Sequence, residues 1–210
     1  MPLSSIEDAI KAYARGEFLV VVDDEDRENE GDLIIAADAM TPEKMAFMIR
    51  HTSGVICAPM SDERADELDL PLMVAENTES MRTAFTVSVD LVEGTSTGIS
   101  ASDRSATVVG LSNPERRRAE FARPGHIFPL RARVGGVLKR AGHTEAAVDL
   151  CALADRQPVG VLCEIVNDDG TMARLSDLEV FAAEHELQLI TIADLIRHRR
   201  RHEKLVEHFG

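Results

Sequence analysis

Two continuous apolar runs, residues 18–22 and 33–37, lie only ten residues apart and constrain the fold of this chain more than any other feature. Neither run shows the alternation of a half-exposed strand, so both are predicted as strands buried on both faces. Such strands need a layer of helices on each side of their sheet. The longest apolar runs have five residues, far short of the roughly 20 that cross a bilayer, so we expect no transmembrane helix.

Helix and strand signals alternate along all 210 residues, with no repeat, low-complexity tract or flexible linker between them. We therefore predict a single domain over residues 1–210, of α/β or α+β class, in which helices flank a mixed central sheet in three layers. Helices are expected at 5–15 (capped by Ser4 and Glu7), 42–50, after Ser61, from about Ser102, at 144–155, after Ser176 (capped with Glu179) and after Thr191. Strands are expected at 18–22, 33–37, 55–58, 85–90, 159–166 and shortly before Thr191, and residues 112–125 are expected to be irregular.

The charge balance excludes one large class of partner. Asp and Glu number 37 against 23 Lys and Arg, which gives a net charge of -14, and the chain has no Trp and one Tyr. Binding to a phosphate backbone needs the opposite sign, and binding to single strands needs aromatic platforms. We expect no nucleic-acid partner.

The N-terminus and the cysteines indicate the compartment. Glu7 and Asp8 stand where a signal peptide has a basic and then an apolar stretch, so we expect a cytoplasmic protein without a membrane partner. Cys57, Cys151 and Cys163 have no paired metal spacing, and we expect them to be reduced and buried.

The segment joining the two apolar runs, residues 23–32, holds seven carboxylates and one Arg. If these side chains converge, their repulsion favours a counter-ion, and carboxylate oxygens suit Mg²⁺, Mn²⁺ or Ca²⁺. A solvated acidic turn explains the same composition. An EF-hand is rejected, because its closing Glu position is occupied by Ala37 and the flanks are predicted strands.

A second candidate segment, residues 140–145, precedes a predicted helix. The amides of Gly142, His143 and Thr144 form a possible anion site, to which Arg140 adds a planar donor group. An ordinary helix cap with a surface histidine is the alternative.

Two single residues and one charged stretch complete the candidates. His126 lies between two prolines in what we predict to be a stiff turn, either as a proton-transfer group or as a structural histidine. Glu164 interrupts an apolar strand, which fits a catalytic carboxyl group or an edge strand. The basic stretch 197–204 is interpreted as a solvated helix end.

Together, these segments resemble the 3,4-dihydroxy-2-butanone 4-phosphate synthases of riboflavin biosynthesis. The resemblance rests on residues 23–32, 95–104, 124–130, 140–145 and 163–174, in that order along nearly the whole chain. It implies a lyase that depends on Mg²⁺ or Mn²⁺ and converts D-ribulose 5-phosphate to L-3,4-dihydroxy-2-butanone 4-phosphate and formate. It also implies a homodimer with active sites at the interface.

Residue by residue, the resemblance assigns three kinds of role. Glu28 and His143 match the metal ligands, whereas Asp32, His126 and Glu164 match positions implied in catalysis. Substrate contacts are implied for Arg27, Glu28, Asp32, Arg140, Ala141, Gly142, His143, Thr144 and Glu164. Glu30 and Asp103 are expected to line the same pocket, and Cys57 matches a cysteine near the site, to which we assign no role.

Two departures from the family pattern are Ala141, where glycine is common, and Glu120, where Asp is usual. A methyl group at position 141 would strain the turn if that residue needs a positive φ.

No GTP cyclohydrolase II domain, which many family members carry, is expected here. Two alternatives remain at this stage: another metal-dependent lyase or isomerase acting on sugar phosphates, and a non-enzymatic module that binds divalent cations.

Overall fold

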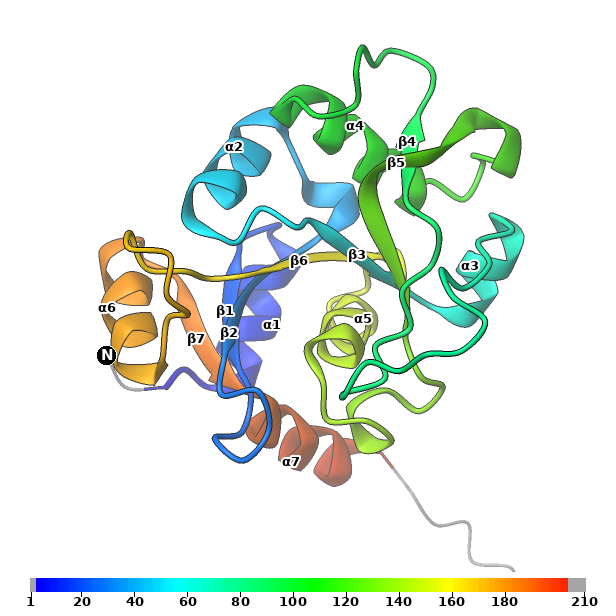
Figure 1. Ribbon diagram of the computed structural model, residues 1–210. Coiled ribbons are helices and arrows are strands. Elements are labelled where there is room, and N and C mark those ends of the chain that lie inside the picture. Colours follow the sequence, from blue (N-terminus) through cyan, green and yellow to red (C-terminus); the bar gives the residue numbers. More distant parts are fainter. Residues whose placement is uncertain (1–2, 204–210) are drawn as a thin grey trace, which may run out of the picture.

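The computed structural model describes residues 3–203. Its centre is one seven-stranded sheet in the order β4-β5-β3-β6-β2-β1-β7, which Figure 1 shows curving around helix α5. The strands are β1 (Leu19–Val22), β2 (Gly31–Ala36), β3 (Cys57–Met60), β4 (Val89–Leu91), β5 (Phe121–Arg131), β6 (Gly160–Glu164) and β7 (Gln188–Thr191). Parallel pairs (β1 with β7, β3 with β5) occur beside antiparallel ones, so the predicted mixed sheet is confirmed.

Helices cover both faces of the sheet, which confirms the three layers. The helices are α1 (Ile6–Ala14), α2 (Pro42–His51), α3 (Asp62–Glu67), α4 (Ala101–Ser112), α5 (His143–Leu153), α6 (Leu175–Glu184) and α7 (Ile192–His202). Short 3-10 turns lie at Ala37–Ala39, Arg118–Glu120 and Gly136–Leu138. One apolar core joins the sheet to α2, α3, α4 and α6, and a second joins the other face to α1, α5 and α7. Among residues 3–203, none of the helices has the length and apolar character that a membrane crossing requires.

The two apolar runs become β1 and β2, which are neighbouring interior strands of the sheet and are buried as expected. Every residue of β1 and β2 is buried, and alternate side chains enter the two cores. The strands are antiparallel, with Val22 opposite Gly31, so the acidic segment is the loop of a hairpin. The three cysteines are free and buried, as predicted.

The segment around His126 is not a turn, contrary to the sequence prediction. Residues 121–131 form the long strand β5. The prediction of irregular structure over residues 112–125 is therefore wrong for residues 121–125. Pro124 is tolerated because it falls where the register between β4 and β5 shifts, and proline is compatible with such irregularities. Gly125 is needed there, since a Cβ atom would lie 2.0 Å from the carbonyl carbon of Val89.

Three smaller expectations need correction. Ser5 rather than Ser4 caps α1, accepting from the amide of Asp8. α6 begins at Leu175, and the Asp177 carboxylate accepts from the amide of Arg174. The predicted capping of this helix by Ser176 and Glu179 is therefore wrong. Of the strand predicted at 85–90, the first part forms only isolated bridges, and the regular strand is β4. The basic stretch lies on α7 as far as His202, and Lys204 falls outside the described residues.

Candidate active site

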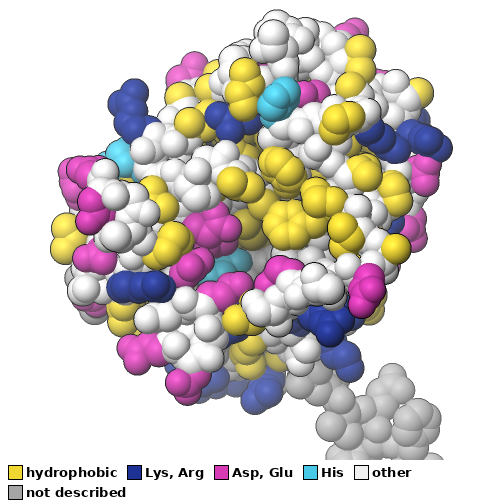
Figure 2. Space-filling model, viewed as in Figure 1, with side chains coloured by type: hydrophobic (Ala, Val, Ile, Leu, Met, Phe, Trp, Pro, Cys, Tyr) yellow, Lys and Arg dark blue, Asp and Glu magenta, His cyan; other side chains and the backbone are white. Residues whose placement is uncertain are grey.

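A polar pocket of about 210 Å³ lies where the β1–β2 loop, the end of β6 and the start of α5 meet. Figure 2 shows carboxylates around a hollow with a histidine in its depth and an apolar patch beside it. The lining residues are Arg27, Glu28, Glu30, Asp32, Cys57, Glu79, Thr83, Phe85, Leu130, Arg140, His143, Thr144, Leu162 and Glu164. The structure therefore brings most of the sequence-predicted site residues together.

Asp23, at the end of β1, organises the acidic loop. Its carboxylate accepts from the guanidinium of Arg27 at 2.7 Å and from the amides of Glu28 and Glu30 at 3.1 and 2.9 Å. These contacts turn Arg27, Glu28 and Glu30 toward the pocket, while residues 24–26 are exposed to solvent. The solvated-turn interpretation thus describes only the tip of the loop.

One corner of the pocket gathers two carboxylates around the ring of His143. His143 Nδ1 lies 3.6 Å from Glu28 Oε2 and 3.9 Å from Asp32 Oδ1. Its other ring nitrogen, Nε2, lies 3.1 Å from the carbonyl oxygen of Val21 on β1. A proton on Nε2 donated to that carbonyl leaves Nδ1 with a lone pair facing the carboxylates, the arrangement that orients a metal-binding histidine.

Burial and crowding shift the pKa values of this corner. Burial above all, with a contribution from the carboxylates of Glu164, Glu28 and Glu30, raises the pKa of Asp32 to about 7 against the opposing effect of His143. Burial alone would lower the pKa of His143, but Asp32, Glu28 and Asp23 raise it to about 9. The contact with His143, and to a lesser extent the charge of Arg27, lowers the pKa of Glu28. Burial raises the pKa of Glu30. Without a metal ion, a proton on His143 balances part of the negative charge.

A divalent cation fits this corner. Asp32 Oδ1 is buried and has no hydrogen-bond partner among the described residues, which is costly unless a cation or a proton satisfies it. Ligand atoms of Asp23, Glu28 and His143 lie within 4.8 Å of one another. Carboxylate oxygens with one imidazole suit Mg²⁺ or, still better, Mn²⁺.

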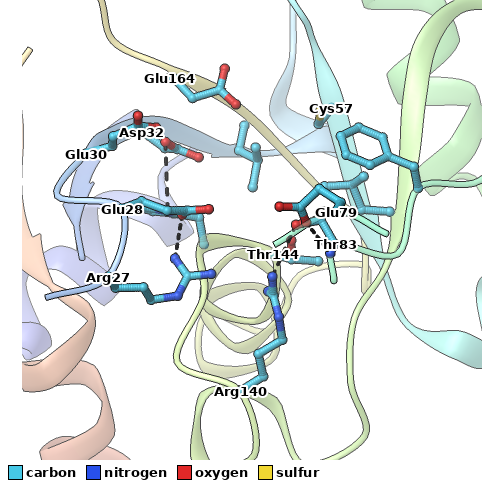
Figure 3. A pocket seen from close by; sticks show the side chains of 14 residues that line it. Arg27, Glu28, Glu30, Asp32, Cys57, Glu79, Thr83, Arg140, Thr144 and Glu164 are labelled. Atoms are coloured by element: carbon cyan, nitrogen blue, oxygen red, sulfur yellow. Dashed lines mark hydrogen bonds and ion pairs between the residues drawn. The ribbon is translucent and has the colours of Figure 1, made fainter. Parts of the chain in front are cut away.

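The opposite corner of the pocket contains the guanidinium of Arg140 and the carboxylate of Glu79. Arg140, just before α5, donates to Glu145 at 2.7 Å and to the carbonyl of Met81 and the hydroxyl of Thr83, each at 3.2 Å. Thr144 lies in the first turn of α5, and Figure 3 shows it close to Arg140, across the pocket from Glu28 and Asp32. α5 has no side-chain cap, so its first amides can bind an anion.

Ala141 and Gly142 flank the pocket and are not among its lining residues. The Gly142 amide donates to the carbonyl of Arg140 at 2.9 Å, so it does not form the anion site predicted for it. Gly142 fits closely, since a Cβ atom there would lie 2.3 Å from the Arg140 guanidinium. Ala141 is not among the described residues with positive φ, so its methyl group causes no backbone strain.

Glu164 ends β6, directly opposite Asp32 on β2. β6 lies between β2 and β3, so the edge-strand explanation is wrong. The hydroxyl of Ser53 donates to Glu164 Oε2 at 2.6 Å, and the Ser53 amide donates to the Glu164 carbonyl at 2.8 Å. The neighbouring pocket thiol, that of Cys57, is buried, and burial raises its pKa well above the usual value.

His126 and Asp103 do not line this pocket. The ring of His126 pairs with Asp90 on β4 at 2.7 Å and is 43% exposed. Asp103 accepts from the amides of Ser96 and Gly98, which shapes the loop before α4.

Sequence reasoning missed the segment that forms one wall, residues 77–85. Glu79 and Thr83 line the pocket there, and amide donors from Met81 and Thr83 lower the pKa of Glu79 to about 2. No periodic pattern marks this loop; the only signal is Asn77 with Glu79, which are turn-forming and capping side chains.

Comparison with known proteins agrees with this geometry. The family model of 3,4-dihydroxy-2-butanone 4-phosphate synthase matches residues 7–198. The synthase of that name from Agrobacterium fabrum is 61% identical over 93% of this chain and 92% of its own length. The monofunctional riboflavin biosynthesis protein RIBA 2 of Arabidopsis thaliana is 60% identical over 97% of this chain, which spans 43% of that relative.

Solved structures agree as well. A 3,4-dihydroxy-2-butanone 4-phosphate synthase in complex with two magnesium ions superposes with a TM-score of 0.94, at 48% identity, covering 97% of this chain and all of the other. A cation-free form of a 3,4-dihydroxy-2-butanone 4-phosphate synthase superposes with a TM-score of 0.91, at 47% identity, covering 96% of this chain and 99% of the other. The chain belongs to the 3,4-dihydroxy-2-butanone 4-phosphate synthase family, an enzyme family of riboflavin biosynthesis.

Proposed function

We propose that this chain converts D-ribulose 5-phosphate to L-3,4-dihydroxy-2-butanone 4-phosphate and formate with the help of Mg²⁺ or Mn²⁺. The observation that carries the proposal is the unpartnered, buried Asp32 Oδ1 beside Glu28 and His143, in the same pocket as Arg140 and the start of α5. One corner suits a cation and the other suits a phosphate group, as a metal-assisted reaction of a sugar phosphate requires. The two magnesium ions of a similar structure support the choice of metal.

Glu28 and His143 would hold the ion, and Nδ1 is the nitrogen of His143 that is free to do so. When bound, the ion supplies positive charge that polarises the substrate's carbonyl and hydroxyl oxygens. Arg27, which is paired with Glu28 at 2.5 Å, is placed to contact the substrate. Arg140, Thr144 and the following amides bind the phosphate group, with Ala141 and Gly142 shaping their turn.

The chemistry begins with removal of the proton next to the ketone to give an enediol, followed by a 1,2-shift of the carbon skeleton and loss of one carbon as formate. The atoms of the pentulose phosphate are conserved in the two products, so no oxidant is required. Asp32 and Glu164 face each other across β2 and β6 and are the acid–base candidates in this pocket. Burial raises the pKa of Asp32 to about 7 in the metal-free pocket, which marks this carboxyl group as one whose protonation its surroundings control.

We further propose that the chain acts as a cytoplasmic homodimer and that His126 of the partner subunit completes the site. His126 lies outside the pocket of its own subunit, where Asp90 orients its ring. Exposed apolar side chains at Val55, Leu72, Met73, Val74 and Ile99 supply the apolar surface that a second copy would cover.

The deciding experiment is to incubate the purified chain with ribulose 5-phosphate and Mg²⁺, with and without chelator, and to measure formate. Formate release that the chelator stops is expected. A different lyase or isomerase on sugar phosphates would consume the substrate without formate, and a cation-binding module would leave it intact. Either result would refute the proposed reaction.

Glu28→Gln tests the assignment of the metal ligand. The amide keeps the size of the side chain but removes its charge, so we expect a loss of at least about 100-fold in kcat/KM, with weaker Mg²⁺ binding and an unchanged fold by circular dichroism. Glu25→Gln, in the exposed tip of the same loop, is the matched control and should be nearly as active as the wild type. An active Glu28→Gln variant that saturates with metal as the wild type does would contradict the assignment.

A further inference from the structure

The structure contains a second group of side chains of metal-binding type, outside the candidate active site. His198 and His202 lie four residues apart on α7, and Glu7 lies in the first turn of α1. One ligand atom from each of the three lies within 4.8 Å of the others. None of the three lines the candidate active site.

Helix geometry accounts for the pairing of the histidines. Residues four apart share one face of a helix, and a histidine pair with this spacing can bind one metal ion. The two rings are 4.2 Å apart between centroids, with an interplanar angle of 29°. His202 Nδ1 lies 2.9 Å from the carbonyl oxygen of His198; a proton donated there leaves Nε2 free to bind a metal.

The carboxylate comes from a different helix. Glu7 Oε1, on α1, lies 3.3 Å from Nδ1 of His198, whose side chain is only 11% exposed. The three side chains border a surface hollow of about 520 Å³ that leaves room for water ligands. Arg197 and Arg201 also line this hollow, and Arg197 is paired with Asp194. Two imidazoles and one carboxylate provide two neutral ligands and one charged ligand, a set that Zn²⁺, Co²⁺, Ni²⁺ and Cu²⁺ prefer to Mg²⁺.

We propose that Glu7, His198 and His202 form a second metal site, which binds a transition-metal dication and joins the first turn of α1 to the last turn of α7. Such a site connects segments that are almost 200 residues apart in sequence, so metal binding stabilises the folded chain. The basic helix end that the sequence suggested was merely solvated thus includes a chelating pair. The site is independent of the reaction proposed above.

The test is a calorimetric titration of the full-length protein with Zn²⁺ in excess Mg²⁺, which competes with Zn²⁺ for the active-site corner. The wild type is expected to bind one more Zn²⁺ than His198→Ala and His202→Ala, each of which should weaken this site at least about 10-fold. Glu7→Gln should weaken it by a smaller factor. With Co²⁺, the wild type should show more visible absorption from nitrogen-ligated ion than the two histidine variants, in which His143 of the active-site corner is the remaining nitrogen ligand.

His185→Ala is the matched control. His185 also lies near a second histidine, His51, with ring centroids 4.9 Å apart, but among residues 3–203 no carboxylate completes a three-ligand group with this pair. The control should bind Zn²⁺ as the wild type does and should show the same Zn²⁺-dependent rise in Tm, whereas His198→Ala should show a smaller rise. Equal stoichiometry and affinity in the wild type and in both α7 histidine variants would overturn the proposal, leaving only an ion pair between Glu7 and His198.

Discussion

At the residue scale, Ser53 is in direct contact with the proposed catalytic carboxylate of Glu164. Its hydroxyl and its amide both donate to Glu164, and its hydroxyl lies 3.2 Å from the thiol of Cys163. Arg104 donates to the carbonyl of the following residue, Gly54, at 3.2 Å. Ser53 is therefore a positioning residue for the Glu164 carboxylate.

Ser53→Ala is expected to lower kcat by about 10- to 100-fold with KM within about threefold, because the carboxylate loses its donor while the phosphate corner is untouched. Formate release at varied ribulose 5-phosphate measures both constants. Ser53→Thr keeps the hydroxyl and should recover most of kcat, which a purely structural role would not predict. A change confined to KM would count against the assignment.

At the element scale, sequence patterns predicted elements better than they predicted contacts. β1, β2 and α5 could be predicted because apolar runs and a glycine-marked helix start are local signals. β5 could not, because its two prolines indicate a turn, and only its pairing with β3 and β4 makes it a strand. Glu79 and Thr83 were missed for a similar reason, since only tertiary contacts bring their loop against Arg140.

The start of α5 gives a prediction at this scale. Gly142→Ala would push the Arg140 guanidinium away from its position, because the new methyl group would lie 2.3 Å from it. The far end of a long side chain can move, so we expect a folded protein with KM for ribulose 5-phosphate raised about 10-fold, since Arg140 is proposed to bind the phosphate group.

Ala141→Gly is the matched control. Ala141 is exposed and its φ is not positive, so glycine there should leave KM within about twofold of the wild type. Equal KM values for Gly142→Ala and the wild type would show that Arg140 does not depend on this turn.

At the scale of the whole molecule, the separation of His126 from the pocket makes the proposed dimer testable. Glu28→Gln and His126→Ala should each be nearly inactive as homodimers. A mixed dimer, purified through a different affinity tag on each subunit, would have one site with both residues intact and should recover about half of the wild-type activity. If each site used His126 of its own subunit, the mixed dimer would stay inactive, so formate release separates the two arrangements.

The acidic corner links the stability of the whole molecule to pH. Burial raises the pKa of Asp32 from 3.8 to about 7, and neighbouring carboxylates raise that of His143 from 6.5 to about 9. Both groups bind a proton more tightly in the folded chain, so the metal-free protein loses stability as pH rises, first through Asp32 and then through His143. Between about pH 6 and pH 9 we expect a loss on the order of 2 kcal/mol, or several degrees in Tm.

A divalent cation should reverse part of this trend. The ion replaces the proton on His143, so its affinity rises with pH up to about 9 and its binding releases a proton. Thermal melts in chelator and in excess Mg²⁺ should therefore diverge as pH increases, and titrations in buffers of different ionisation enthalpy should detect the released proton. His143→Gln should flatten the pH dependence in chelator, and a metal-free Tm that rises from about pH 6 to pH 9 would contradict the coupling of Asp32 and His143 to folding.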